Sequence, residues 1–284
     1  MNAALNNAQL SANLQMQTQS WDKFSKGRLR AEEACAAGPT FQVAFGQSEP
    51  DAFAIFTHDE IWTSSPRVLP PDLKAKFDAR EIDLGTLAVV ALGPRGAWFA
   101  RWGKNAAWNL AALDTRDREA FTQQVNAAAS QPGQLGGIEG IVDFSFGDQG
   151  QAVMIFNRGS NIMWTNVFPP ARDFEKTVKQ LAADGQTFFR ASLAVGGRSA
   201  IVLQKQGRAA AWSRDSPHWP CADLAAVLQG DRVSETIASL TCSATQPEFW
   251  FAAFIDANGK LRFSANVPDA AVAELARAGP MRVS

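Results

Sequence analysis

The chain has 284 residues, enough for one large domain or two ordinary ones, and its 46% hydrophobic and 19% charged residues are typical of a globular protein with a sizeable core. Its 27 basic and 28 acidic side chains give a net charge of -1, which provides no general reason to expect nucleic acid or a membrane surface as a partner. No apolar run approaches the roughly 20 residues that a bilayer-spanning helix needs.

Residues 1–38 are rich in Asn, Gln and Ala and contain no alternating apolar pattern. They lack the basic and continuous apolar segments of a signal peptide. We expect a polar N-terminal tail here, within which residues 20–38 (SWDKFSKGRLRAEEACAAG) could form a helix. The folded domain is predicted to span residues 39–284.

One pattern recurs five times in residues 39–284, about every 50 residues. Each copy has two apolar, alternating segments and a short third segment, separated by polar or Gly-containing breaks, which predicts three strands joined by hairpins. The third segment ends in an aromatic residue followed by a small polar one. These aromatic residues are Trp62, Trp108, Trp164, Trp212 and Phe263. Four other tryptophans are not repeated in register, so a specific function could reside with them: Trp98, Trp102, Trp219 and Trp250.

A helical period follows each third segment, with apolar residues three or four positions apart. Examples are Leu73 with Phe77, Phe121 with Val125, and Phe174 with Val178. The predicted repeat is therefore strand, strand, strand, short helix.

A unit of this size cannot bury both faces of its sheet alone, so the repeats are expected to stack against one another. Five copies without polar capping repeats favour a closed ring over an open solenoid, and we predict a mainly β, five-bladed β-propeller. In repeat size and number, residues 41–284 are similar to the five-bladed lectin propellers of the tachylectin type. The alternative is a pentein-like α/β propeller, a ring of five ββαβ units.

The end of the chain parallels the passage from the fourth repeat into the fifth. Met281, Arg282 and Val283 stand where a sixth repeat would begin. We therefore expect the C-terminal residues to lie beside the first repeat, near Phe41, with the last helix docked on its strands.

No catalytic or metal-binding motif is present in the sequence. The two histidines, His58 and His218, are far apart, and Cys35, Cys221 and Cys242 show no metal-type spacing. His218 and Cys221 could form a nucleophilic pair, although a loop histidine beside a structural cysteine is the favoured interpretation. Scattered cysteines predict reduced thiols and a cytoplasmic location. We expect no cofactor and no metal, and the absence of such motifs favours a non-enzymatic protein over an enzyme.

The repeated tryptophans support two interpretations. Recurrence at one position favours packing between repeats, whereas an indole beside a small polar residue could also bind the face of a sugar ring. On the second interpretation the chain is a lectin-like module that recognises a carbohydrate or glycoconjugate. The candidate ligand-binding residues are Trp62, Trp108, Trp164, Trp212, Trp98, Arg101 and Asn109. A protein-interaction scaffold and a pentein-like enzyme, or its inactive relative, are the alternatives.

Overall fold

The computed structural model describes residues 16–20, 42–47, 49, 52–165, 172–194, 200–204, 209–212, 224, 236–255, 260–268, 271, 275 and 281–283. The helix predicted within residues 20–38 lies outside these residues, as do His218 and Cys221. Trp212 is described only by its place in a strand.

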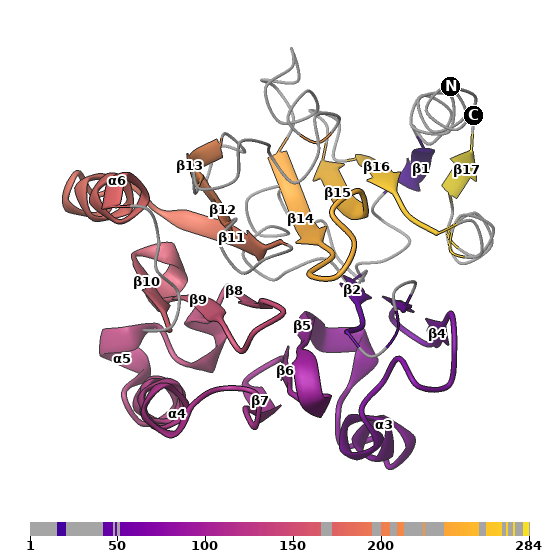
Figure 1. Ribbon diagram of the computed structural model, residues 1–284, viewed down its shortest axis with the longest axis horizontal. Coiled ribbons are helices and arrows are strands. Elements are labelled where there is room, and N and C mark those ends of the chain that lie inside the picture. Colours follow the sequence, from indigo (N-terminus) through magenta and orange to yellow (C-terminus); the bar gives the residue numbers. More distant parts are fainter. Residues whose placement is uncertain are drawn as a thin grey trace.

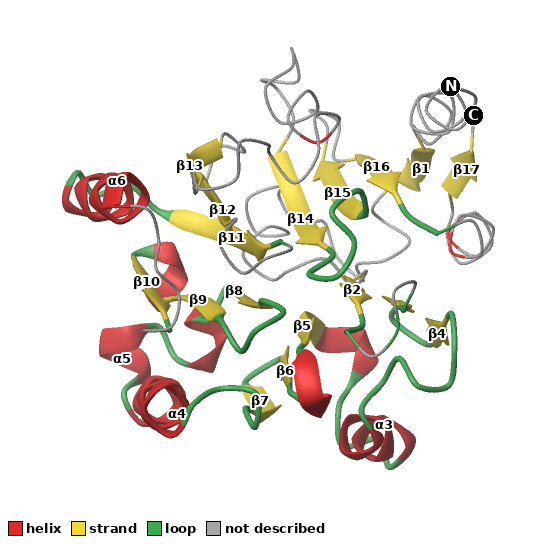
Figure 2. Ribbon diagram, in the orientation of Figure 1, coloured by secondary structure: helices red, strands yellow, loops and turns green. Residues whose placement is uncertain are grey.

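Five antiparallel sheets make up the described structure (Figures 1 and 2). The first three are β2 (Gln42–Phe45), β3 (Phe53–Phe56) and β4 (Ile61–Thr63); β5 (Leu87–Leu92), β6 (Trp98–Trp102) and β7 (Asn105–Asn109); and β8 (Asp143–Phe146), β9 (Ala152–Phe156) and β10 (Asn161–Trp164). The last two are β11 (Phe188–Leu193), β12 (Ala200–Gln204) and β13 (Ala209–Trp212); and β14 (Thr236–Cys242), β15 (Trp250–Ile255) and β16 (Lys260–Asn266). The predicted three-stranded units are confirmed.

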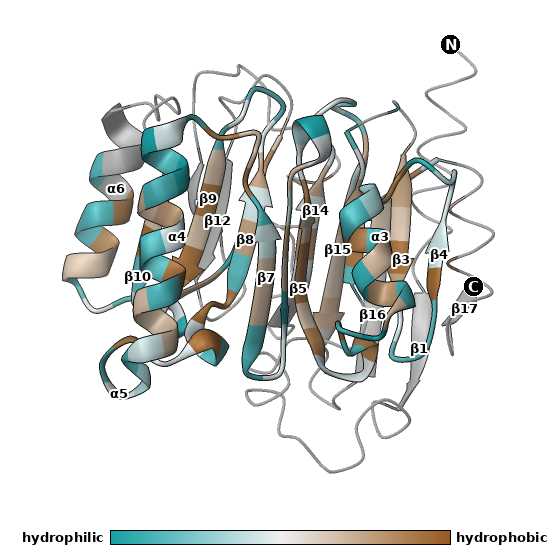
Figure 3. Cartoon of the chain, turned by 90° about the horizontal axis from the view of Figure 1, so that it is seen from below, coloured by the Kyte–Doolittle hydropathy of each residue, from teal (hydrophilic) through white to brown (hydrophobic). Residues whose placement is uncertain are grey.

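Helices follow the third strands of the first three sheets and stand at the outside of the molecule (Figure 2). They are α3 (Pro71–Asp78), α4 (Thr115–Ser130), the single turn α5 (Pro132–Leu135) and α6 (Arg172–Ala183). Asp114 caps the N-terminus of α4, because its carboxylate accepts a hydrogen bond of 2.8 Å from the Asp117 N–H. In Figure 3, α3 and α4 carry many hydrophilic residues, while strands such as β5 and β9 are largely hydrophobic.

The strand order distinguishes the two predicted architectures. In each sheet the three strands pair antiparallel and in chain order, and in the first three units the helix follows the third strand. A ββαβ unit would place a helix between the second and third strands. The pentein-like alternative therefore does not match the described units.

Hydrophobic clusters fill the spaces between consecutive sheets. The alternation of side chains along each strand sends one set of apolar residues toward the preceding sheet and the other set toward the following one. Val43 and Ile55 of the first sheet thus pack with residues of the fifth, whereas Ala44 and Phe56 pack with residues of the second. Each cluster also contains helical side chains: Leu73 and Phe77 of α3, Phe121 and Val125 of α4, Val178 of α6, Leu224, and Ala271 with Leu275.

The first strands of the sheets contact one another in turn about a common centre (Figure 1). β2 lies beside β5, β5 beside β8, β8 beside β11, and β11 beside β14, while β14 in turn contacts β2. The cluster formed by the first and fifth sheets includes Val43, Phe45, Ala271 and Leu275. The last helical residues therefore pack on strands of the first unit, as the sequence predicted.

The two ends of the chain extend the fifth sheet, which the sequence did not predict. Strand β1 (Met16–Ser20) pairs with β16, and β17 (Met281–Val283) pairs with β1, all antiparallel. The sequence predicts that the C-terminal residues lie beside the first repeat, near Phe41. They instead lie at the outer edge of the fifth, because residues 16–20 occupy the place next to β16.

Candidate functional site

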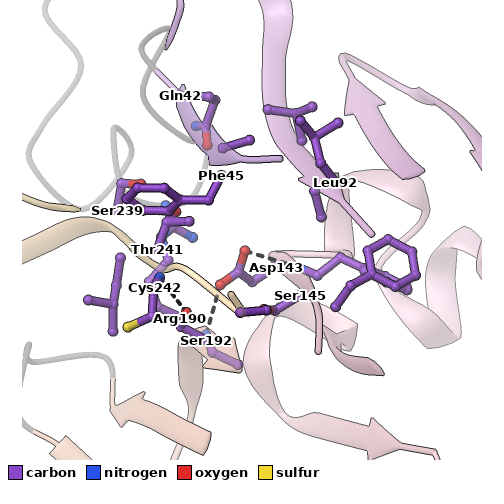
Figure 4. A pocket seen from close by; sticks show the side chains of 18 of the residues that line it. Gln42, Phe45, Leu92, Asp143, Ser145, Arg190, Ser192, Ser239, Thr241 and Cys242 are labelled. Carbon is purple, nitrogen blue, oxygen red and sulfur yellow. Dashed lines mark hydrogen bonds between the residues drawn. The ribbon is translucent and has the colours of Figure 1, made fainter. Parts of the chain in front are cut away.

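A small cavity lies where the five first strands meet (Figure 4). Residues of β2, β5, β8, β11 and β14 all line it, so every sheet contributes to one site. The space that water-molecule centres can occupy inside it is about 30 Å³. Since one water molecule needs at least about 10–15 Å³ by this measure, the cavity holds a few waters or one small ligand and is too small for a sugar ring.

Side chains lining this cavity bond to the backbone of the neighbouring first strand. Ser145 Oγ accepts a hydrogen bond of 3.0 Å from the Leu193 N–H, and Ser192 Oγ accepts one of 2.8 Å from the Cys242 N–H. Thr241 Oγ1 donates to the Val43 carbonyl at 3.1 Å. These hydroxyls replace the strand pairing that is missing between sheets, and so satisfy backbone groups at the buried centre.

The contact between the second and third sheets differs. In the described structure, no side-chain hydrogen bond joins β5 to β8. Apolar groups meet there instead: the rings of Phe99 and Phe144 stack with centroids 4.5 Å apart, and the Phe146 ring packs against Gly93. A Cβ atom on Gly93 would lie 2.7 Å from that ring, so only glycine permits this approach.

Two charged side chains are among those that line the cavity. Asp143 at the start of β8 and Arg190 of β11 both line it (Figure 4). Asp143 Oδ2 accepts the Ala191 N–H at 2.8 Å, and Oδ1 accepts the Phe144 N–H at 3.0 Å. Arg190 Nη1 donates to the carbonyls of Val142, at 3.0 Å, and Phe189, at 2.7 Å.

Arg101 of β6 does not line the cavity, but its charge interacts with those of Asp143 and Arg190. Only 3% of Arg101 is exposed, compared with 4% of Arg190. Within the described residues, Arg101 Nε has no hydrogen-bond partner. Burial, followed by the positive charge of Arg190, lowers the pKa of Arg101 to about 10, while Glu139 and Asp143 oppose this change.

Asp143 is also perturbed by its surroundings. Burial raises the pKa of this carboxyl from 3.8 to about 6, although the charge of Arg190 and the bonds from Ala191 and Phe144 favour the ionised form. Desolvation therefore has the larger effect. At neutral pH the carboxylate is ionised, and near pH 6 about half of it is protonated.

The predicted aromatic position is shared by three repeats, not five. Trp108 lies opposite Phe99, Trp164 opposite Val153 and Trp212 opposite Ile201. Each of these three partners is the second residue of the second strand in its sheet. Trp62 is displaced by one residue, and Thr63 occupies the equivalent position. Because successive strand residues point to opposite faces, Trp62 packs toward the fifth sheet, whereas Trp108 packs toward the third.

Phe263 is displaced as well. It lies opposite Ala253, two residues away from the position that Trp108 occupies in its sheet. Hairpin lengths differ between repeats, so the order of residues along the chain does not give the register of the third strand.

Trp98 and Trp250 form a repeated pair that the sequence alignment missed. Each begins the second strand of its sheet, opposite the last residue of the first strand, and Phe53 has the same place in the first sheet. Their exposed fractions are 1%, 0% and 0%. An alignment of the repeats on their first and second strands, instead of on the third, would have revealed this shared position.

The other candidate residues do not gather in one place. Trp98 and Arg101 are buried, whereas Trp62, Trp108 and Trp164 are half-buried on third strands. Asn109 is half-buried and donates to the Asp72 carboxylate of α3 at 3.0 Å, on the face of β7 opposite to Trp108. Trp108 and Asn109 therefore cannot line a single pocket. The side chain of Trp212 lies outside the described residues.

Among the residues that the structure describes, no three His, Cys, Asp or Glu side chains gather closely enough to hold a metal ion. His58 lies in an exposed hairpin with its Nδ1 3.4 Å from Asp59 Oδ1, and Cys242 is buried. In the same part of the chain, each helix is too short or too polar to cross a membrane.

No family model, no curated protein and no solved structure matches the chain. Its function has to be inferred from its own geometry.

Proposed function

We propose that the five sheets form a closed, five-bladed β-propeller over residues 39–284. The cyclic order of contacts among β2, β5, β8, β11 and β14 supports closure. The cluster that joins Phe45 of the first sheet to Leu275 of the last helix supports it as well. Closure leaves no exposed terminal repeat and explains the absence of polar capping repeats.

We further propose that this propeller is a non-enzymatic binding module that recognises a carbohydrate or glycoconjugate in a lectin-like manner. The observation that carries the proposal is the position of the third-strand tryptophans. Trp108 and Trp164 occupy equivalent positions, and each is packed against a core cluster while part of it stays exposed. An indole fixed on one side and accessible on the other can stack on the C–H face of a sugar without losing much conformational entropy.

The proposed sites lie at the outer strands, because the central cavity cannot hold a sugar ring. Trp62 is a third platform, although it faces a different cluster from Trp108. Several weak sites on one molecule predict an avidity for multivalent glycans well above the affinity for a monosaccharide.

A glycan array tests this proposal. Trp108→Ala and Trp164→Ala are expected to reduce or abolish the signal, whereas Trp98→Phe should leave it unchanged because Trp98 is buried. No glycan signal from the wild-type protein, together with a specific protein partner, would favour the scaffold alternative. The remaining alternative, a catalytic Cys or His, is refuted if a variant without His218, Cys221 and Cys242 keeps its function.

Cytoplasmic location is part of the same proposal. Cys242 is buried among apolar side chains, and the sequence shows no disulfide framework. Fractionation of cells that express the full chain tests this expectation.

A further inference from the structure

The outer edge of β7 has no strand beside it. This strand is the last of the second sheet, and in the described part of the chain its backbone hydrogen bonds join it to β6 alone. The segment NAAWN contains no charged residue and no proline, and it pairs with β6 from Asn105 to Asn109 without a bulge. Short strands, charges, prolines and bulges are the usual features that keep an exposed strand edge from pairing. The edge of β7 lacks all of them.

The fifth sheet shows what such an edge can hold. Its third strand, β16, has the same place in its sheet as β7, and the extended segment β1 pairs antiparallel with its outer edge. The remaining third strands are less suited to pairing. β4 has three residues, β10 has four, and the register of β13 on β12 shifts between Val202 and Leu203. Within the described structure, β7 is therefore the longest regular third strand whose outer edge is uncovered.

The backbone groups that β7 presents at this edge follow from the register of its sheet. The Ala97 carbonyl accepts a hydrogen bond of 2.8 Å from the residue that follows β5, so this carbonyl faces β5. The direction alternates along an antiparallel strand, so the groups of Trp98 face β7 and bond to those of Asn109, its partner. The N–H and C=O groups of Trp108 and Ala106 therefore point away from β6.

The surroundings of the edge favour a single extended chain as its occupant. Figure 1 shows α3 and α4 on either side of β7 and farther from the centre of the molecule, and Figure 3 shows β7 between them. A second folded copy would meet these helices before its own β7 reached the edge. Residues 106–109 are half-buried and Asn105 is exposed, so solvent already reaches the strand.

The two faces of β7 select the side chains of such a peptide. On one face, Trp108 and Ala106 pack against the cluster between the second and third sheets and stay partly exposed. On the other face, Asn109 donates to the exposed carboxylate of Asp72 at 3.0 Å. Residues of an added strand lie directly opposite those of β7 and alternate between the same two faces. An apolar side chain thus fits opposite Trp108 and a basic one opposite Asn109.

We propose that the outer edge of β7 binds an extended peptide, which adds to the second sheet as a fourth, antiparallel strand. The peptide carries apolar side chains opposite Trp108 and Ala106 and a basic side chain near Asp72. This site goes beyond the glycan proposal and adjoins it at Trp108. Its tests therefore change backbone groups and keep the indole in place.

A fluorescent peptide of sequence Lys-Val-Thr-Val-Thr is the probe, and fluorescence polarisation with the full chain measures its binding. Its lysine would lie opposite Asn109 and its valines opposite Trp108 and Ala106. Methylation of both valine N–H groups should weaken binding about tenfold or more, because these groups donate to the outward carbonyls of β7. Methylation of the threonine N–H between them should change the affinity by less than about twofold, because that group faces away. Equal affinities of the three peptides, or no binding of the unmodified one, would overturn the proposal.

Ala106→Pro removes one outward N–H of β7 and no hydrogen bond to β6. It should weaken binding of the unmodified peptide about tenfold or more. Ala106→Val keeps the N–H and so separates this loss from the effect of a larger side chain. Both variants retain Trp108, so the glycan array should give the same signal for each, and the two proposals can fail independently. Wild-type peptide affinity in Ala106→Pro would contradict the proposed site.

Hydrogen exchange on the wild type covers the case in which Ala106→Pro does not fold. An excess of the peptide should slow exchange of the Ala106 and Trp108 amides. The amides of Ala107 and Asn109 already bond to β6 and should change little. Equal effects on all four amides would overturn the proposal. Dimerisation that slows the same two amides without peptide would do so as well, because it would assign the edge to a second copy.

Discussion

At the scale of single residues, ionisation of Asp143 should make stability depend on pH. Its pKa is higher in the folded protein, about 6, than the ordinary value of 3.8, so the folded state binds more protons between these values. The free energy of unfolding should therefore fall as pH rises from about 4 to 6, by on the order of 3 kcal/mol.

The measurement is denaturant unfolding of the wild type and of Asp143→Asn at pH 4, 5, 6 and 7. The wild type should lose stability relative to the variant across this window and show no further relative change above it. Parallel profiles for the two proteins would show that Asp143 titrates normally.

The tryptophans provide a second prediction at this scale. Trp98→Ala should lower the free energy of unfolding by about 3–5 kcal/mol, because Trp98 is 1% exposed within a core cluster. Trp108→Ala should cost clearly less, because Trp108 is half-buried and part of its ring already contacts solvent. Both variants replace tryptophan by alanine, so urea unfolding compares the cost of the same chemical change at the two positions. An equal or larger cost at Trp108 would mean that its ring serves the core alone.

Only part of the site could be predicted from single residues. The recurrence of Trp108, Trp164 and Trp212 was visible in the sequence and corresponds to one register position. The displacement of Trp62 was not visible, because it follows from hairpin geometry. The group of Arg101, Asp143 and Arg190 could not be predicted either, since its members come from three sheets and no local spacing relates them.

At the scale of elements, one hairpin glycine controls how the third sheet meets the fourth. Gly159, at the end of the turn between β9 and β10, has a φ of 91°, and a Cβ atom there would lie 2.0 Å from the Phe188 carbonyl oxygen. Gly96, between β5 and β6, has a φ of 75° but no atom within 4 Å of such a Cβ.

The two glycines form a matched pair for mutagenesis. Gly96→Ala should cost about 1 kcal/mol from backbone strain alone. Gly159→Ala should cost several times as much, because the first strand of the fourth sheet must move away. Thermal unfolding of both variants gives the comparison, and similar losses of Tm would mean that the contact with Phe188 relaxes easily.

Elements were easier to predict from the sequence than sites. Alternation and helical spacing are properties of short segments, so the three-stranded units and the helices α3, α4 and α6 could be predicted. Strand β1 could not, because the segment MQTQS has no apolar alternation and its pairing with β16 and β17 depends on residues at least 240 positions away.

At the scale of the whole molecule, the proposed closure would make the last helix necessary for the first sheet. Leu275 is fully buried in the cluster that contains Val43, Phe45 and Ile55. Deleting residues 268–284 should therefore lower hydrogen-exchange protection in β2 and β3 as well as in β15 and β16. Leu275→Ala is a milder test, with an expected cost of about 2–5 kcal/mol. Unchanged protection of β2 and β3 in the truncated protein would indicate an open array of repeats.

The interface between the second and third sheets should lose stability on cooling sooner than interfaces that contain more hydrogen bonds. Ser145, Ser192 and Thr241 carry hydrogen bonds across three other interfaces, whereas the second and third sheets meet through the stacked rings of Phe99 and Phe144 and through the contact of Gly93 with Phe146. Hydrophobic contacts weaken on cooling. Chilling should therefore weaken this interface before the three interfaces that hydroxyl hydrogen bonds cross, so that the proposed ring would open at one place while those three contacts persist.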